Sequence, residues 1–139
     1  MTPLERISER VRRLGDPDDP STPRPLLTVD EFFIGNTTVG SIGCNLPSGP
    51  TPAQFFTLFK SFAERNDVKD IRLQVTAFDD PDWPFSDTVY IMTLATADVV
   101  ASWFPEDLAS DEVQEGFLDQ TYEPYIVPDG CKVVACWWD

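Results

Sequence analysis

The sequence predicts an α+β domain of the ferredoxin-like split βαβ type, in which an antiparallel sheet carries two helices on one face. Residues 71–78 largely alternate between apolar and polar side chains, which is the period of a strand with one buried face. Residues 55–62 place four apolar side chains on one helical face, directly behind a capping box at 51–54. Segments of these two kinds then follow one another in the order that this plan requires.

Each element has its own local signal. Glycines at 40 and 43 favour a bulged first strand, and Pro52 suits a helix start. The segments DTVYIMTL and CKVVACWW are apolar on both faces, as expected of strands covered on both sides. The expected elements are a strand at 38–46, a helix at 51–65, strands at 70–78 and 87–95, a helix at 96–104 and a strand at 131–138.

In this plan the strand order is 4-1-3-2, which places Cys44 and Cys136 on neighbouring strands. The sheet face away from the helices is apolar and includes Phe78. An exposed apolar face of that size implies a cover. A partner protein, a second copy of the chain and the long connection at 105–130 all remain open as that cover.

The first 25 residues are expected to stand apart from the domain at 26–139. Residues 4–14 form a short amphipathic helix whose narrow apolar stripe is expected to add little to the core. A proline-rich acidic linker follows. Within the domain, Thr28 and Glu31 form a capping box ahead of two phenylalanines, which predicts a brief helix at the core edge.

Charge limits the classes of function. The net charge is −14, and residues 78–139 hold fourteen acids against the single base Lys132. Such a field repels nucleic acid and anionic membranes and attracts basic partners, although acidity also serves solubility alone. The start of the chain lacks an apolar signal region, and no apolar run is long enough to span a bilayer, so we expect a cytoplasmic protein.

The residues of covalent and metal chemistry are scarce. The chain has no histidine, which removes the usual general base for a serine or cysteine nucleophile. Its three cysteines form no C-x-x-C pair, so we expect free thiols, no structural zinc and no cofactor. The glycine-rich GSIGCNLPSG matches no phosphate-binding loop.

Acidic residues gather in two stretches near aromatic side chains. The loop DDPDWPFSD is stiffened by two prolines and crowded with carboxylates, which suits either a divalent cation or, more simply, a solvated turn. The connection at 105–130 is long and acidic, and connections of that length are usually functional. The candidate partner-binding residues are Asp79, Asp80, Asp82, Trp83, Asp87, Glu106, Asp111, Glu112, Glu115 and Tyr122.

Four segments carry a resemblance to a known group. DEFFIGN, GSIGCNL, DWPFSDTVY and the terminal WWD resemble small acidic bacterial single-domain proteins of unassigned function. The resemblance runs from Leu26 to Asp139 and implies one folded domain. It implies no catalytic residues.

The leading hypothesis is an acidic interaction domain that binds a basic protein, of the immunity or inhibitor type, because aromatic side chains anchor interfaces and charge speeds encounter. One alternative is a carboxylate-based domain or enzyme that binds a metal or small molecule. Another is a homodimeric scaffold that associates through the apolar sheet face.

Overall fold

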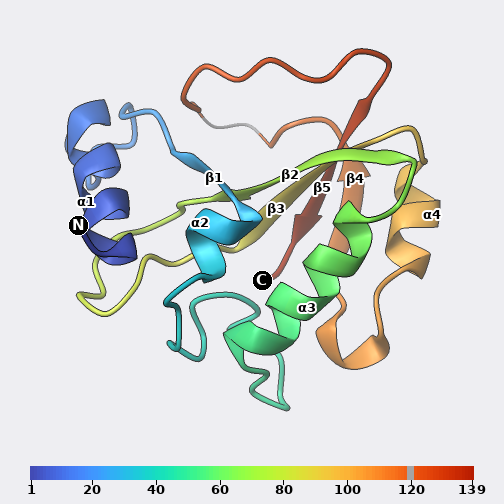
Figure 1. Ribbon diagram of the computed structural model, residues 1–139, viewed down its shortest axis with the longest axis horizontal. Coiled ribbons are helices and arrows are strands. Elements are labelled where there is room, and N and C mark those ends of the chain that lie inside the picture. Colours follow the sequence, from blue (N-terminus) through green and yellow to red (C-terminus); the bar gives the residue numbers. More distant parts are fainter. Residues whose placement is uncertain (119–120) are drawn as a thin grey trace.

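The computed structural model describes residues 1–118 and 121–139, and shows helices packed on one face of an antiparallel sheet (Figure 1). Among the described residues the strands run in the order β1-β2-β3-β5-β4, each antiparallel to its neighbours. The strands are β1 (Leu26–Thr28), β2 (Val68–Gln74), β3 (Thr88–Thr93), β4 (Glu112–Glu115) and β5 (Lys132–Trp137). The helices are α1 (Pro3–Leu14), α2 (Val29–Phe33), α3 (Pro52–Ala63), α4 (Ala97–Ser102) and the 3₁₀ turn η1 (Glu106–Leu108).

The structure confirms the α+β class and the antiparallel sheet, but it does not have the ferredoxin-like strand order. The predicted strand at 38–46 does not form, because this segment is a series of turns. The predicted pairing of strands that carry Cys44 and Cys136 is therefore wrong: Cys44 is exposed and Cys136 is buried in β5. Two short strands that were not predicted, β1 and β4, form the two edges of the sheet.

The turns at 38–46 have a physical cause in Gly43. Its φ of +64° lies in the left-handed region, which an extended strand does not use. A Cβ atom at this position would lie 2.6 Å from Cζ of Phe55, so α3 packs directly against the glycine backbone. The glycine thus marks a turn and a close approach rather than a bulged strand.

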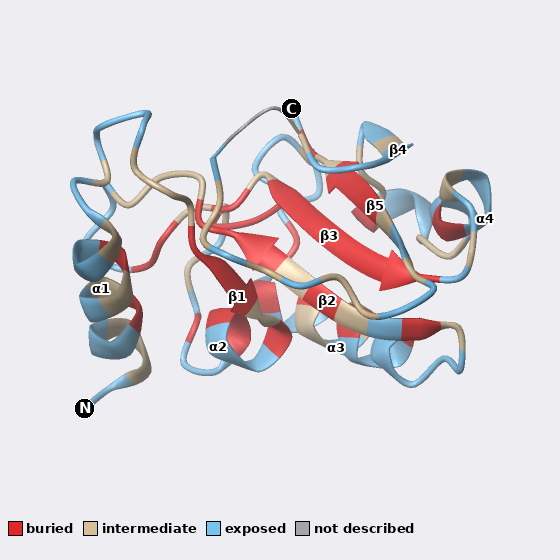
Figure 2. Cartoon of the chain, turned by 90° about the horizontal axis from the view of Figure 1, so that it is seen from above, coloured by how far each residue is buried: buried red, intermediate tan, exposed pale blue. Residues whose placement is uncertain are grey.

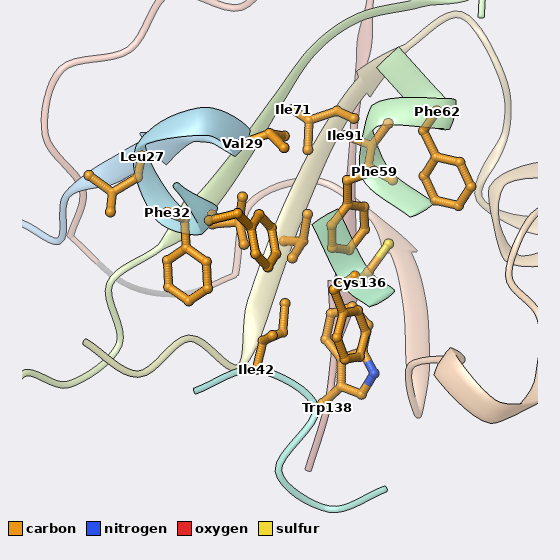
Figure 3. Close-up of a cluster of buried hydrophobic side chains, with 14 of the residues drawn as sticks. Leu27, Val29, Phe32, Ile42, Phe59, Phe62, Ile71, Ile91, Cys136 and Trp138 are labelled. Carbon is orange, nitrogen blue, oxygen red and sulfur yellow. The ribbon is translucent and has the colours of Figure 1, made fainter. Parts of the chain in front are cut away.

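The main core lies between the sheet and the three helices α2, α3 and α4. The inner faces of these elements are buried (Figure 2). Buried rings from α3 pack against those of α2 and against Trp138 (Figure 3). The Phe55 and Trp138 rings meet edge to face at 5.8 Å, a favourable aromatic geometry. The predicted apolar stripe of α3 is confirmed, since Phe55, Phe59 and Phe62 are buried. The capping box of α2 is present as predicted.

The second face of the sheet is covered by the chain itself. A segment that we call the strap, residues 121–131, crosses this face with Tyr122, Tyr125 and Val127 packed over it. Beneath it Tyr90 and Met92 of β3 are completely buried. The strap is thus one of the covers that the sequence left open, while homodimerisation stays a prediction.

Helix α1 packs onto the domain, contrary to the expectation that it adds little to the core. Ile7 and Val11 are 3% and 4% exposed and belong to the main hydrophobic cluster. Its start is capped by Thr2, whose hydroxyl accepts a hydrogen bond from the Glu5 N–H at 3.1 Å. No helix in the described ranges is both long enough and apolar enough to cross a bilayer.

Candidate interaction surface

Five exposed acids lie close together in the sequence between α4 and the end of β4. We call this group the acidic edge, and it consists of Glu106, Asp107, Asp111, Glu112 and Glu115, all exposed. They come from η1, from β4 and from the link between them. Pro105 stands at the N-cap position of η1, three residues after the last residue of α4.

One member of the acidic edge has internal partners. The Asp111 carboxylate accepts from the side-chain amide of Asn45 at 2.6 Å and from the backbone N–H of Asp139 at 2.7 Å. It therefore holds the last residue of the chain beside the edge. The side chains of Glu106, Glu112 and Glu115 have no hydrogen-bond or ion-pair partner among the described residues.

The predicted acidic loop is exposed, but its aromatic anchor is not. Asp79, Asp80 and Asp82 face solvent, and the Asp82 N–H donates to the Asp80 carboxylate at 2.8 Å in a local turn. Trp83 is only 4% exposed and lies in the main core. The prediction that Trp83 presents a surface to a partner is therefore wrong, because the indole supports the loop from inside.

The structure places Asp87 and Tyr122 in a polar network rather than on an open surface. One oxygen of the half-buried Asp87 carboxylate accepts from the hydroxyls of Thr76 at 2.7 Å and Thr88 at 2.9 Å. Thr76 in turn accepts from the Gln74 amide at 2.9 Å. These bonds satisfy polar groups buried between the sheet and the strap.

The network continues to the strap through two tyrosines. The Tyr90 hydroxyl donates to the side-chain oxygen of Gln74 at 3.2 Å and also contacts the Tyr122 hydroxyl. Burial and the neighbouring Tyr122 raise the pKa of Tyr90 well above its ordinary value. Tyr90 is therefore a neutral structural group, and Tyr122 binds the strap to the sheet.

The acidic loop and the acidic edge do not form one surface. The loop lies on the α1 side of the molecule, and η1 lies at the opposite end below α4 (Figure 1). Of the described acids in residues 78–139, only Glu123 takes part in an ion pair. Their charge is thus left for solvent, counterions or a partner.

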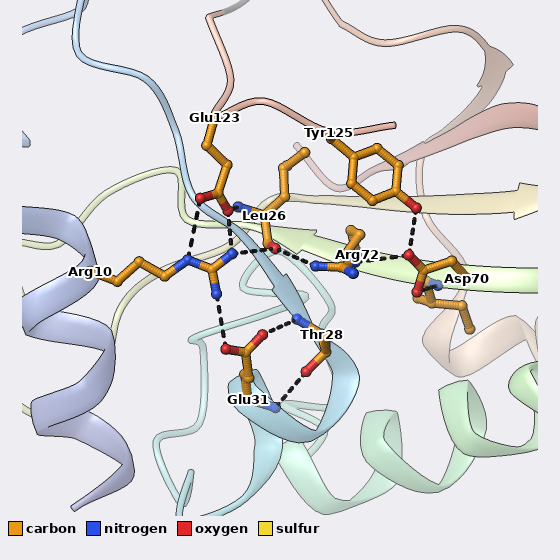
Figure 4. Close-up of polar contacts among 9 residues, drawn as sticks. Arg10, Leu26, Thr28, Glu31, Asp70, Arg72, Glu123 and Tyr125 are labelled. Carbon is orange, nitrogen blue, oxygen red and sulfur yellow. Dashed lines mark hydrogen bonds and ion pairs between the residues drawn. The ribbon is translucent and has the colours of Figure 1, made fainter. Parts of the chain in front are cut away.

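A second polar group, which the sequence did not predict, joins α1, β1 and the strap. Arg10 pairs with Glu31 of α2 at 2.9 Å and with Glu123 of the strap (Figure 4). Arg10 also donates to the Leu26 carbonyl at 3.1 Å, and Glu123 accepts from the Leu26 N–H at 2.7 Å. We call the side chains of Arg10, Glu31 and Glu123 the β1 cap.

No local pattern predicts the β1 cap, because Arg10 and Glu123 are 113 residues apart. The capping box at Thr28 and Glu31 was the only visible part. Burial acts against the ionisation of Glu31, but the Thr28 amide and the Arg10 guanidinium outweigh it and hold the pKa of Glu31 below its ordinary value.

The structure offers little for a metal ion or a small molecule at the predicted residues. Within residues 1–118 and 121–139, no three acidic, cysteine or histidine side chains converge in a way that could hold a metal ion. A hollow of about 200 Å³ lies between α1 and α2, lined by Ile7, Leu27 and Ile34 among others. None of the predicted candidate residues lines it.

The fold and its exposed carboxylates define a small α+β protein with one strongly acidic sheet edge. The model of the family described as "Uncharacterized protein YfbO family" matches residues 2–136, and the chain belongs to this family. It is 46% identical over 140 residues to "Uncharacterized protein YfbO" of Escherichia coli (strain K12), with all of both chains covered. No solved structure is significantly similar. The expected likeness to small bacterial proteins of unassigned function is thereby confirmed.

Proposed function

We propose that the protein is an acidic interaction domain that binds a basic protein, of the immunity or inhibitor type, through the acidic edge. The observation that carries the proposal is the state of the carboxylates: Glu106, Glu112 and Glu115 are exposed, close in sequence and without partners among the described residues. Unpaired like charges on one surface repel one another, and a basic partner relieves that repulsion while it accelerates encounter.

The acidic edge is favoured over the acidic loop because aromatic surface accompanies it. Trp137 of β5 lies directly opposite Glu112 and is half-buried, and Phe117 is 38% exposed. Aromatic side chains beside charge are typical of interface anchors. In the loop the corresponding indole, Trp83, is buried.

The test compares two variants that lose the same charge. The edge variant carries Glu106→Gln, Glu112→Gln and Glu115→Gln, and the loop variant carries Asn in place of Asp79, Asp80 and Asp82. Each immobilised protein is incubated with host lysate at low salt, and the retained proteins are identified and quantified. We expect a stoichiometric basic protein that binds the wild type and the loop variant and is lost from the edge variant.

The salt dependence of binding is the second test. Exposed charge pairs are screened when the Debye length falls to about 4 Å, at about 0.5 M salt. We expect the basic protein to be released under that condition. A retained protein whose affinity is the same at low and high salt, or one lost equally from both variants, would show that the acidic edge is not the binding surface.

A further inference from the structure

The two edges of the sheet are treated differently by the rest of the chain. Strands β1 and β4 are the outer strands, so each has one side without a strand neighbour in the described structure. An edge strand exposes backbone N–H and C=O groups that are ready to pair with another extended chain. The partners of these outward backbone groups therefore decide whether each edge can accept another strand.

At β1 the outward groups belong to Leu26 and Thr28. The Val75 N–H donates to the Pro25 carbonyl at 3.0 Å, and the alternation of an antiparallel ladder then turns Leu27 toward β2 and its two neighbours outward. The backbone N–H groups of Leu26 and Thr28 both donate to side chains.

The β1 cap supplies those side chains. Glu123 accepts from the Leu26 N–H at 2.7 Å, and Glu31 accepts from the Thr28 N–H at 2.9 Å. Arg10 donates to the Leu26 carbonyl from the same side (Figure 4). This edge is closed to any added strand unless the β1 cap opens.

At β4 the outward groups belong to Val113 and Glu115. The Gly116 N–H donates to the Val133 carbonyl at 2.7 Å, so by the same alternation Gln114 faces β5 and its two neighbours face away from it. No side chain or backbone group of the described residues pairs with these outward groups. This edge is open.

The side chains of β4 define what the open edge accepts. Residues directly opposite each other in a ladder point to the same face, so Glu112 shares the strap face with Trp137, and Val113 and Glu115 point to the helix face. Val113 packs against the main core, whereas both glutamates are exposed. The carboxylates of Glu112 and Glu115, at the two ends of the strand, repel an acidic added strand and attract a basic one.

We propose that β4 is a docking edge that binds an extended basic segment of a partner as a sixth strand. The proposal rests on the proposed function and adds the mode of binding. In the antiparallel orientation of this sheet, the segment reads basic, polar, apolar, basic. Its bases lie opposite Glu115 and Glu112, and its apolar residue lies opposite Val113. Main-chain bonds to Val113 and Glu115 supply affinity, and the alternating side chains supply specificity.

The same acids also have a protective role, because charged residues on an edge strand discourage self-association. That role does not compete with the proposal. Carboxylates reject a second copy of this acidic chain and leave only a basic strand acceptable. The experiment must nevertheless separate strand addition from simple charge attraction.

A pair of variants at one position makes that separation. Glu115→Gln and Glu115→Pro remove the same charge, but only proline removes the outward N–H. Proline is tolerated at such an edge position because the missing N–H is not part of the ladder to β5. The probe is a short synthetic peptide with Lys-Thr-Val-Lys at its centre, and its control has the order Val-Lys-Lys-Thr, which has the same composition but does not match the pattern in any register. Affinities are measured by fluorescence anisotropy at low salt.

We expect the patterned peptide to bind more tightly than its control, and Glu115→Pro to bind it about five- to tenfold more weakly than Glu115→Gln. In the wild type, NMR hydrogen exchange at the Val113 and Glu115 amides should slow by at least about tenfold when the patterned peptide binds. The exchange reading does not depend on any variant and holds even if Glu115→Pro folds poorly.

Failure of the inference is distinct from failure of the proposed function. Equal binding of the two peptides, with unchanged exchange at Val113 and Glu115, refutes strand addition and leaves charge-driven binding in place. Absence of binding by either peptide at low salt refutes both. Slowed exchange at other β4 amides alone would place the peptide on a sheet face and would also overturn the docking edge.

Discussion

Removal of the Glu123 carboxylate should loosen the strap and destabilise the whole domain. Glu123→Ala takes away the acceptor of the Leu26 N–H and one of the two carboxylates of Arg10. The side chains of Glu123 and Arg10 are 16% and 22% exposed, so solvent screens their interaction only in part. Leu26 is 1% exposed, so in the variant its N–H would be buried without a hydrogen-bond partner and with little access to water.

The expected loss can be estimated from these contacts. A hydrogen bond to a charged group contributes about 1.5–3 kcal/mol, and a buried donor without a partner costs about 1–3 kcal/mol. The two estimates describe overlapping effects, so we expect the free energy of unfolding to fall by about 2–3 kcal/mol. For a chain of this size that corresponds to a fall in Tm of about 6–12 °C.

Urea unfolding monitored by tryptophan fluorescence measures this change. Glu106→Ala is the matched control, because Glu106 is exposed and unpaired in the described structure, and it should change stability by less than about 0.5 kcal/mol. A double-mutant cycle with Arg10→Met should give a coupling energy of about 1–2 kcal/mol. A Glu123→Ala protein as stable as the control, or a coupling energy of zero, would refute this account of the β1 cap.

Three further predictions concern other parts of the molecule. Gly43→Ala should lower the free energy of unfolding by about 2–4 kcal/mol, because the new Cβ would lie 2.6 Å from the Phe55 ring at a φ of +64°. The control Gly49→Ala has a φ of +57° but open space around it, and it should lower the free energy of unfolding by only about 1 kcal/mol. Equal denaturation midpoints for the two variants would contradict this prediction. Because the pKa of Glu31 is lowered in the folded state, stability should decline as the pH falls below about 4.5, and Glu31→Gln should flatten that decline in acid-unfolding curves. Burial and the Asp70 carboxylate raise the pKa of Tyr125, so stability should decline above about pH 10, where the unfolded chain ionises first; a Tyr125→Phe protein with an unchanged alkaline slope would show that another group is responsible.

The elements that the sequence predicted are those with a strong local signal. The capping box and phenylalanine stripe of α3 depend only on neighbouring residues, and so do the apolar runs of β3 and β5. The two edge strands were missed because each is short. The four residues of β4 read as an acidic loop, and the three of β1 lie directly before the capping box of α2. Only pairing with a remote strand reveals either one.

The predicted strand order is wrong because it depends on a strand at 38–46, where the structure has turns. The alternation around Val39 and Ile42 favoured a strand, but the left-handed Gly43 against the Phe55 ring requires a turn. With that strand absent and β4 present, the split βαβ order cannot form. Gly43 marks a turn and close packing against α3, not a bulge in a strand.

The candidate surface was predicted in composition but only partly in arrangement. The exposed state of Glu112 and Glu115 follows from their charge. The burial of Trp83 and the engagement of Asp87 by two threonine hydroxyls do not follow from any local pattern. The outward direction of the Val113 and Glu115 backbone depends on the register with β5, which is a property of the assembled sheet.

The separation of 113 residues between Arg10 and Glu123 has a consequence for the order in which the chain folds. Contacts between distant parts of a chain form only after a long loop has closed, whereas α3 and the neighbouring β2 and β3 need much shorter closures. We therefore expect the β1 cap to assemble after the rate-limiting barrier. Glu123→Ala should then speed unfolding by most of its equilibrium effect and leave the refolding rate nearly unchanged. The β1 cap would thus slow the unfolding of the folded domain without changing how fast the domain folds.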